Sequence, residues 1–295
     1  MAGTAGSAND PGTPAGGPGR SSPRVVGPPR LGAAARSTLA AAVSTAVVLG
    51  LLVLVVVNAP NWPAVQESFF NGEVFWSSLP AILNAFRVNI ALFMISEVLI
   101  LGFGLVVAVL RSLPGPVFTP VRVLTTVYVD IFRALPGVLV IYILGFGIPG
   151  LQIPGVPSSP FFYAVLALTL IYSAYVSEVY RAGIDSVHPS QDAAARSLGL
   201  SRFQALRFVV LPQAVRRVVP PLLNDFIGLQ KDTVLVSYIG VVEIFRASQI
   251  KQAATFNFTP YIATALVFIV VTIPLARFTD WLVARDRKRQ LAGAR

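Results

Sequence analysis

The sequence predicts an all-α membrane protein, a polytopic bundle of six transmembrane helices, on three observations. Of its 295 residues, 55% are hydrophobic and only 12% are charged, and its mean hydropathy of +0.71 lies outside the range of ordinary soluble domains. The apolar residues gather in six stretches long enough to cross the roughly 30 Å hydrocarbon core of a bilayer. The basic residues are distributed asymmetrically between those stretches.

Each apolar stretch is bounded by Pro, Gly or charged residues, which mark the ends of helices. The first begins at Thr38 and runs for 20 residues. A cleaved signal peptide is the alternative there, but the apolar core of such a peptide would be shorter. The six predicted spans are residues 38–57, 88–110, 123–147, 160–180, 219–240 and 261–283.

The positions of Lys and Arg predict the orientation of the bundle. With six spans, both chain ends lie on one side of the membrane. If that side is cytoplasmic, 17 of the 23 Lys and Arg residues lie on the inner side and two lie outside, which is the distribution that membrane proteins favour. The net charge of +10 therefore needs no nucleic acid as a partner.

The residue types present exclude several kinds of chemistry. The chain has no cysteine, which excludes disulfides and thiolate metal sites, and His188 is its one histidine. A hydrolase needs a nucleophile beside a base, and a single loop histidine makes a poor candidate for that base. No G-x-x-x-x-G-K-[ST] motif occurs, so the chain has no loop of this kind to cradle ATP phosphates. We expect no catalytic residue, no bound metal and no cofactor.

A charged segment, SQDAAARSLGLSRFQALRFVVLPQA at residues 190–214, separates the fourth and fifth spans. Pro189 suits the first position of a helix that runs to Leu198, because a helix leaves the first N–H unpaired anyway. Gly199 suits the left-handed conformation that ends a helix. The segment is therefore predicted to begin with one short helix.

A second short helix is predicted to follow directly. Ser201 and Gln204 have the spacing of a capping box, which marks its start. Pro212 is expected to end it after Leu211, since proline has no N–H and clashes with the carbonyl one turn back. Each helix has an apolar stripe and a basic flank, so the segment is predicted to be an amphipathic helical hairpin.

Three uses of such a hairpin are open. It could lie in the lipid headgroup layer, bind DNA as a helix-turn-helix, or dock a cytoplasmic protein. A DNA-binding motif needs supporting helices, and a loop of about 37 residues between two spans has no third helix. The lipid and protein alternatives remain.

The hairpin resembles the EAA loop of the inner-membrane permease subunits of binding-protein-dependent ABC importers, whose pattern is E-A-A-x-x-x-G-x(9)-I-x-L-P. When Gly199 is aligned with the glycine of that pattern, the acidic position is occupied by Ala193, and Asp192 lies one residue earlier. The residues that the resemblance assigns to coupling with an ATPase are Asp192, Ala193, Ala194, Ala195, Gly199, Leu211 and Pro212.

The similarity extends to VDIFRALPG upstream, EVYRAGIDSVHPSQ before the hairpin and LPQAVRRVVPPLLNDFIGLQKDTVLVSYIGVVE after it. These motifs look like those of permeases for polar amino acids such as glutamate, glutamine and histidine. The resemblance implies a five-helix permease core plus one extra N-terminal span, in the bacterial cytoplasmic (inner) membrane. It also implies three kinds of partner: ABC ATPase subunits, an extracytoplasmic solute-binding protein, and a second permease subunit in a homo- or heterodimer.

The resulting domain organisation has four parts. They are a disordered basic cytoplasmic tail at 1–37, the extra span with an outer loop at 38–75, the permease domain at 76–285 with its coupling loop at 189–212, and a basic cytoplasmic tail at 286–295.

The fifth span contains the polar run NDFIGLQKDT, residues 224–233. Ionisable residues inside a span cost about 2.5–3.5 kcal/mol each and so face partners or water. One interpretation is a polar cavity at the subunit interface that meets the charged groups of an amino acid, and the other is a set of interhelical pairs that hold the bundle together. The candidate substrate-pathway residues are Asn224, Gln230, Lys231, Asp232 and Thr233.

An ion-coupled secondary transporter is the alternative function, with Asp225, Lys231 and Asp232 as its coupling charges. Six spans without an inverted repeat argue against it, because many such transporters are built from inverted repeats. Both functions would place the solute pathway along the fifth span. The long cytoplasmic hairpin distinguishes them, because it also argues against a secondary transporter.

Three local pairs complete the predictions. Asp130 and Arg133 are three apart and can pair on one helix face. They lie either at the cytoplasmic boundary beside a proline kink, with the third span starting near Pro136, or buried and facing the bundle. Glu178 and Arg181 have the same spacing at the end of the fourth span. Gly102 and Gly104 lie within a span, where glycines permit close helix packing.

Overall fold

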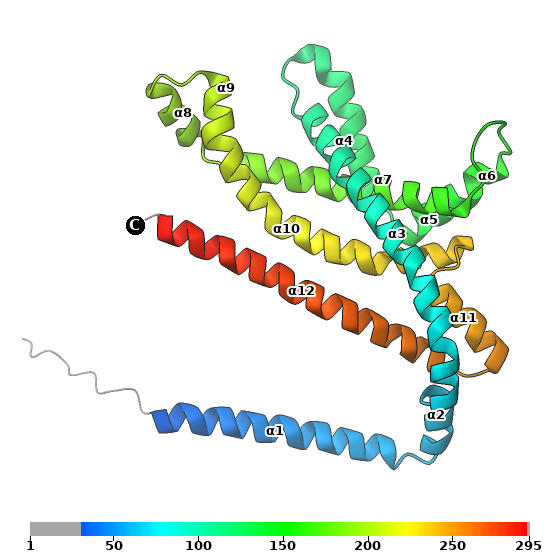
Figure 1. The fold of residues 1–295 in the computed structure, drawn as a ribbon. Coiled ribbons are helices and arrows are strands. Elements are labelled where there is room, and N and C mark those ends of the chain that lie inside the picture. The colour runs from blue at the N-terminus through cyan, green and yellow to red at the C-terminus, as the bar shows by residue number, and fades with distance from the viewer. Residues whose placement is uncertain (1–30, 294–295) are drawn as a thin grey trace, which may run out of the picture. The chain divides into compact units, whose positions relative to one another are not determined.

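The computed structural model describes residues 31–293, and this part of the chain is helical with connecting turns and no β-strand (Figure 1). The all-α prediction is confirmed. Most of the predicted N-terminal tail lies outside the described residues. The helices and helical turns are α1 (Leu31–Val57), α2 (Trp62–Phe69), α3 (Gly72–Arg111), η1 (Pro116–Phe118), α4 (Thr119–Ala134), α5 (Gly137–Tyr142), η2 (Ile143–Gly147), α6 (Ile148–Gly150), α7 (Pro160–Asp185), α8 (Pro189–Ser197), α9 (Arg202–Ala205), η3 (Leu206–Val210), α10 (Leu211–Asp232), η4 (Thr233–Ile239), α11 (Ile244–Thr255) and α12 (Thr259–Gly293).

The described residues divide into two units, one that ends at Pro60 and one that begins at Asn61. The first contains α1, whose segment Ser37–Val57 has 21 residues with a mean hydropathy of 2.8. That length is enough to cross a bilayer, in agreement with the predicted first span. The helix begins at Leu31, earlier than predicted, because the run GAAARS consists largely of good helix formers.

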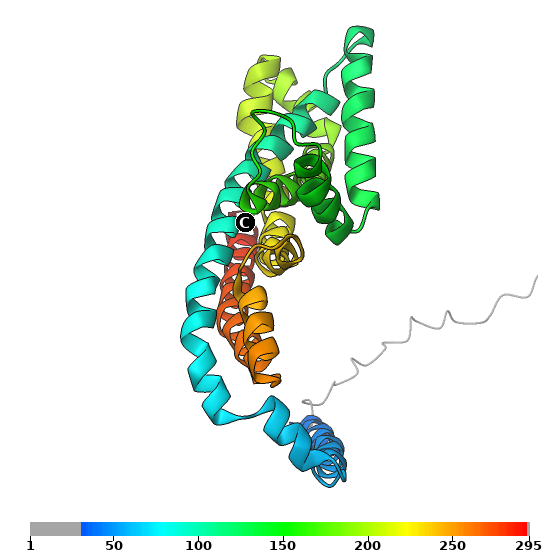
Figure 2. The same ribbon diagram turned by 90° about the vertical axis from the view of Figure 1, so that its right-hand side faces the viewer.

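In the second unit α3 packs along much of α7, and it also lies along α11 and α12 (Figure 2). Helix α10 lies between α7 and α12 (Figure 1). The main apolar core joins α3, α5, α7, α10 and η4 through buried residues such as Leu92, Leu168 and Leu229. A hydrogen bond joins α4 to this core. The Tyr128 hydroxyl of α4 donates to the Leu170 carbonyl of α7 at 2.6 Å.

Two of the predicted spans are broken helices. Residues 116–134 and 137–150 meet at a bend of 110°, and residues 202–239 and 244–255 meet at a bend of 50°. Among residues 31–293, four unbroken helices are long and apolar enough to cross a membrane, and the count reaches the predicted six when each bent pair is one span. The first break falls at Leu135 and Pro136, as expected for a residue that precedes proline and is thereby kept out of the helical conformation.

The predicted ion pair between Asp130 and Arg133 does not form. Asp130 is exposed, whereas the guanidinium carbon of Arg133 lies 5.7 Å from the ring centroid of Tyr175 on α7. Arg133 therefore turns toward α7, because a cation is attracted by the face of an aromatic ring on the neighbouring helix.

The segment between the first and second predicted spans, residues 58–87, was expected to be a connecting loop and is largely helical. Helix α3 starts at Gly72, because Asn71 caps it by accepting a hydrogen bond from the Val74 N–H at 3.0 Å. Before it, α2 packs against the turn between α11 and α12, where Phe69 stacks on Phe258 with ring centroids 5.0 Å apart. Pro and Gly are loop signals in a sequence, but here they lie at the ends of helices.

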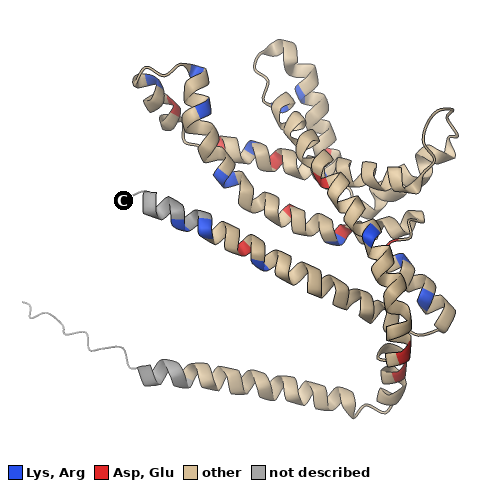
Figure 3. Ribbon diagram, viewed as in Figure 1, with Lys and Arg blue, Asp and Glu red and all other residues tan. Residues whose placement is uncertain are grey.

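Basic residues gather at one end of the second unit. Figure 3 shows Lys and Arg on the α8–α9 hairpin, at the adjoining start of α10 and toward the end of α12. The first half of α12, residues 259–276, carries none (Figure 3). This distribution is what the charge asymmetry of the sequence predicts for the cytoplasmic side.

Of the two glycines predicted to permit close packing, only Gly104 does so. A Cβ atom at Gly104 would lie 2.8 Å from a methyl carbon of Val176 and 3.3 Å from the Ser173 carbonyl oxygen, whereas one at Gly102 would meet nothing within 4 Å.

We therefore expect Gly104→Leu to lower the free energy of unfolding by about 1–3 kcal/mol through overpacking of α3 against α7. The matched variant Gly102→Leu should change it by about 0.5 kcal/mol or less. The measurement is thermal unfolding of the purified variants in one detergent. Equal losses for the two variants would show that the α3–α7 contact at Gly104 does not restrict side-chain size.

Candidate functional site

The first helix of the hairpin, α8, has a specific cap at each end. The His188 imidazole accepts a hydrogen bond from the Ser190 N–H at 3.2 Å, and Pro189 occupies the first turn. At the other end Gly199 has φ of +87°. The Leu200 N–H bonds to the Ala195 carbonyl at 3.3 Å, which with the left-handed Gly199 makes a Schellman motif. The predicted use of Gly199 as a helix terminator is confirmed.

The second helix begins with the predicted capping box. The Ser201 hydroxyl accepts from the Gln204 N–H at 3.3 Å, and the Gln204 side chain accepts from the Ser201 N–H at 2.8 Å. The predicted end at Leu211 is wrong. The chain continues from α9 through a π-helical turn, η3, into α10, with Pro212 in the first turn of α10. A wider π turn accommodates the missing N–H and the ring of Pro212 without ending the helix.

The hairpin exposes small and apolar side chains together. Ala193 and Ala194 are exposed, whereas Ala195 is buried and Asp192 is half-buried. Around them, the exposed fractions of Leu198 and Phe203 are 86% and 67%. Large apolar side chains this exposed, next to alanine and glycine, are typical of a surface that another molecule covers.

The two ends of the hairpin are joined where α7 ends and α10 begins. The Arg217 guanidinium donates to the Ser186 carbonyl. Gly183 of α7 leaves room for Val218 of α10, because a Cβ atom at Gly183 would collide with the Val218 side chain. The hairpin is therefore held to both helices at its base.

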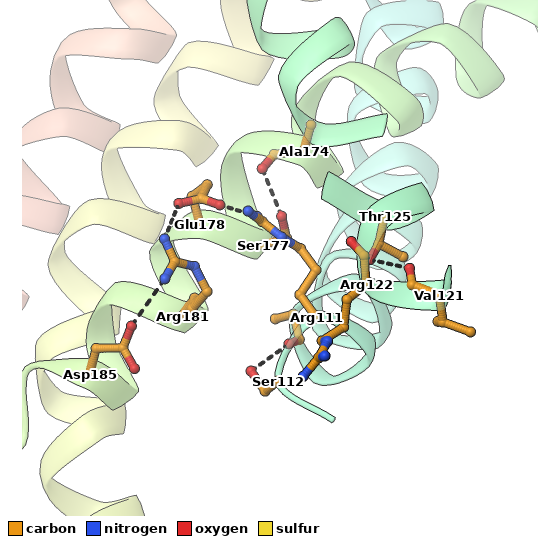
Figure 4. A network of polar contacts seen from close by, with 11 residues as sticks. Arg111, Ser112, Val121, Arg122, Thr125, Ala174, Ser177, Glu178, Arg181 and Asp185 are labelled. Atoms are coloured by element: carbon orange, nitrogen blue, oxygen red, sulfur yellow. Dashed lines mark hydrogen bonds and ion pairs between the residues drawn. The ribbon is translucent and has the colours of Figure 1, made fainter. Parts of the chain in front are cut away.

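A chain of alternating charges lies beside this base (Figure 4). Glu178 pairs with Arg181 at 3.0 Å, as predicted, and Arg181 pairs with Asp185 at 3.2 Å. Glu178 also pairs with Arg111 at the end of α3. The sequence does not reveal this last pair, because Arg111 and Glu178 are separated by 67 positions.

A cavity of about 420 Å³ opens between α4, α7 and α10, and Glu178 is one of the residues that line it. Arg133, Arg217 and Asp225 line it with Glu178, so its wall carries both signs of charge. One carboxylate oxygen of Asp225 is buried without a hydrogen-bond partner among the described residues. Within the same part of the chain no cluster of three or more His, Cys, Asp or Glu side chains has the geometry to hold a metal ion.

The five candidate substrate-pathway residues are placed in different surroundings. Asn224 and Lys231 are exposed, and Asp232 is half-buried and accepts a hydrogen bond from the Tyr172 hydroxyl at 2.8 Å. Gln230 and Thr233 are buried in hydrogen bonds between helices. The side-chain amide oxygen of Gln230 accepts from the Thr272 hydroxyl of α12 at 3.0 Å. Their assignment to a pathway stays a prediction.

A buried polar network beside Thr233 was missed by the sequence. Asn89 of α3 donates to Thr233 at 3.0 Å and to Glu243 at 3.0 Å, and accepts from the Ile244 N–H at 3.0 Å. Glu243 caps α11 by accepting from the N–H groups of residues 245 and 246. The available signal was Asn89 within the second predicted span, because a polar side chain inside a span faces a partner in the protein.

The chain belongs to the family described as the binding-protein-dependent transport system inner membrane component, whose model matches residues 100–288. The matched range contains the hairpin, its base and the polar run of α10. The chain is therefore a membrane-embedded permease component of a binding-protein-dependent ABC transporter.

Individual relatives agree with the family. The chain is 36% identical over 188 residues to the probable glutamine ABC transporter permease protein GlnM of Bacillus subtilis (strain 168). This match covers 63% of this chain and 83% of GlnM. It is 35% identical over 215 residues to the glutamate transport system permease protein GluC of Corynebacterium glutamicum, covering 69% of this chain and 93% of GluC. Among solved structures, it is similar to one chain of an amino acid ABC transporter crystallised with histidines, at 29% identity and a TM-score of 0.64, over 70% of this chain and 94% of that one.

Proposed function

We propose that the protein is the permease subunit of an ABC importer for polar amino acids, and that a separate ATPase drives it through the α8–α9 hairpin. The hairpin carries the proposal: it exposes small and apolar residues at the basic end of the unit, and both of its ends are fixed to membrane-crossing helices. The similarity to glutamine and glutamate permeases supports the substrate class.

The energy for transport comes from a partner in this proposal. The chain has no phosphate-binding loop motif of its own, so a nucleotide acts on an ATPase subunit and the permease binds no cofactor. Two further partners complete the complex: a solute-binding protein on the outer side and a second permease subunit. The hairpin and both chain termini lie in the cytoplasm, in accordance with the distribution of basic residues.

The mechanism follows from the base of the hairpin. A groove on the ATPase receives α8 and α9, with Leu198 and Phe203 as apolar anchors. Movement of the groove is passed to α7 through Ser186 and to α10 through Arg217. The helix pair then tilts between two packed arrangements, and the nucleotide state of the ATPase sets which one is populated.

The function is tested by uptake into liposomes that contain the permease, its ATPase and its binding protein. We expect accumulation of a radiolabelled polar amino acid that requires ATP hydrolysis and survives the collapse of ion gradients by ionophores. Uptake that needs a proton or sodium gradient and no ATPase would contradict the proposal and favour a secondary transporter.

A substitution series at Gly199 tests coupling through the hairpin. A side chain at this position has free space, so any penalty in the isolated chain comes from the left-handed backbone. Gly199→Val should strain that backbone and lower the amount of solute moved per ATP by about tenfold. Gly199→Asn is the matched control, because asparagine adopts this conformation readily, and it should retain most of the coupling.

Two results would contradict coupling by the hairpin. One is wild-type transport per ATP in the Gly199→Val variant. The other concerns the Ser197→Cys variant. A membrane-impermeant thiol reagent added outside intact cells should not label it, and labelling would contradict the proposal. The natural chain has no cysteine, so a label reports that position alone.

We also propose that Asn224, Gln230, Lys231, Asp232 and Thr233 line the substrate pathway, with Asp232 in contact with the amino acid. Asp232→Asn should raise the substrate concentration for half-maximal uptake by about tenfold, because a neutral amide loses the charge-assisted hydrogen bond to an ammonium group. Tyr172→Phe is the control, since it removes the internal partner of Asp232 and leaves its charge. Unchanged half-saturation in Asp232→Asn would remove this residue from the pathway.

A further inference from the structure

The Glu178 carboxylate joins two helices that are far apart in the sequence. One of its oxygens pairs with Arg111, the last residue of α3, and the other pairs with Arg181 one turn further along α7. Figure 4 shows Glu178 with these two guanidinium groups on its two sides. Each carboxylate oxygen of Glu178 therefore has its own arginine partner.

The burial of this group makes the Arg111–Glu178 pair the significant one. The exposed fractions of Arg111 and Glu178 are 12% and 21%, against 42% and 63% for Arg181 and Asp185 at the outer end of the charge chain. Exposed pairs contribute little because water screens them. Removing one partner of a shielded pair leaves a charge with neither water nor a counter-charge.

Glu178 lies about two helical turns before the base of the hairpin. After it, α7 ends at Asp185, and the next carbonyl, of Ser186, is held by Arg217. Movement of the hairpin therefore reaches the last two turns of α7 first. On the α10 side these turns border the cavity of about 420 Å³, and their close contact there is that of Gly183 with Val218.

On the α3 side the link continues into α4. Arg111 is followed by a turn that Arg122 closes, by donating to the Leu113 carbonyl at 3.1 Å and to the Thr119 hydroxyl at 2.8 Å. The end of α3 and the start of α4 are thereby fastened together. An ionic bond at Glu178 connects this pair of helices to the end of α7.

We propose that Glu178 is a positioning residue that makes the end of α7 and the end of α3 move as one body, so that displacement of the hairpin is passed on to α3 and α4. The inference rests on the proposed coupling function. Without the bond, the hairpin and the end of α7 move relative to α3, and ATP hydrolysis continues with little transport.

The test uses the full complex with its ATPase and binding protein in liposomes, and measures ATP hydrolysis and solute uptake together. Glu178→Gln should lower the solute moved per ATP by about fivefold or more, with hydrolysis retained. A merely structural loss would lower uptake and hydrolysis together and leave their ratio unchanged. Asp185→Asn, at the exposed end of the same charge chain, is the matched control and should leave the ratio within about twofold.

A double-mutant cycle assigns the effect to the bond between the two helices. Arg111→Gln should lower the ratio as Glu178→Gln does, and the double variant should be no worse than either single one. Independent, multiplying losses would overturn the inference. If Glu178→Gln does not assemble, Glu178→Asp serves instead, because its shorter side chain cannot reach both arginines at once and should give the same fall.

The outcomes separate the inference from the function on which it rests. A wild-type complex without ATP-dependent uptake overturns the proposed function and this inference with it. A wild-type complex that transports, with a normal ratio in Glu178→Gln, overturns the positioning by Glu178 alone.

Discussion

The structure depends on the rule that a backbone N–H or C=O inside a bilayer must find its partner within the protein. Unbroken helices such as α3 satisfy the rule by themselves. A break in a helix leaves unpaired groups, which a side chain can satisfy. The clearest case is the break between η4 and α11. There, Glu243 and Asn89 accept hydrogen bonds from the N–H groups of residues 244, 245 and 246.

The irregularities are concentrated in the segment that contains the fifth predicted span. Residues 206–239 begin with a π-helical turn at 206–210, contain Pro220 and Pro221 within α10, and end in the 3-10 segment η4. Proline and π turns bend helices and weaken the regular ladder of hydrogen bonds. By contrast, α7 has no proline beyond its first turn. One supporting helix of the hairpin is thus regular and the other is interrupted, a difference that allows the two to respond unequally to the same force.

Local features of the fold and the site could be predicted from the sequence, and distant contacts could not. The capping box at Ser201, the left-handed Gly199 and the Glu178–Arg181 pair each depend on residues within one or two turns. The Arg111–Glu178 and Asn89–Glu243 contacts join residues that lie far apart in the chain. Apolar periodicity carries no information on which two polar groups meet. The wrong end of the second hairpin helix has a different cause, since the rule that proline ends a helix assumes α-helical geometry.

The position of the polar residues along α10 connects coupling with passage of solute. Arg217 near its start is bonded to the end of α7, Asp225 faces the cavity beside Glu178, and Asp232 at its end is bonded to Tyr172 of α7. The same pair of helices is therefore joined at the hairpin and again at the polar run, with a space between. A change in the angle of α10 against α7 at one joint must alter the other, because the regular part of a helix transmits a tilt along its length. In the proposed mechanism, this geometry lets a contact outside the membrane change the surroundings of a carboxylate within it.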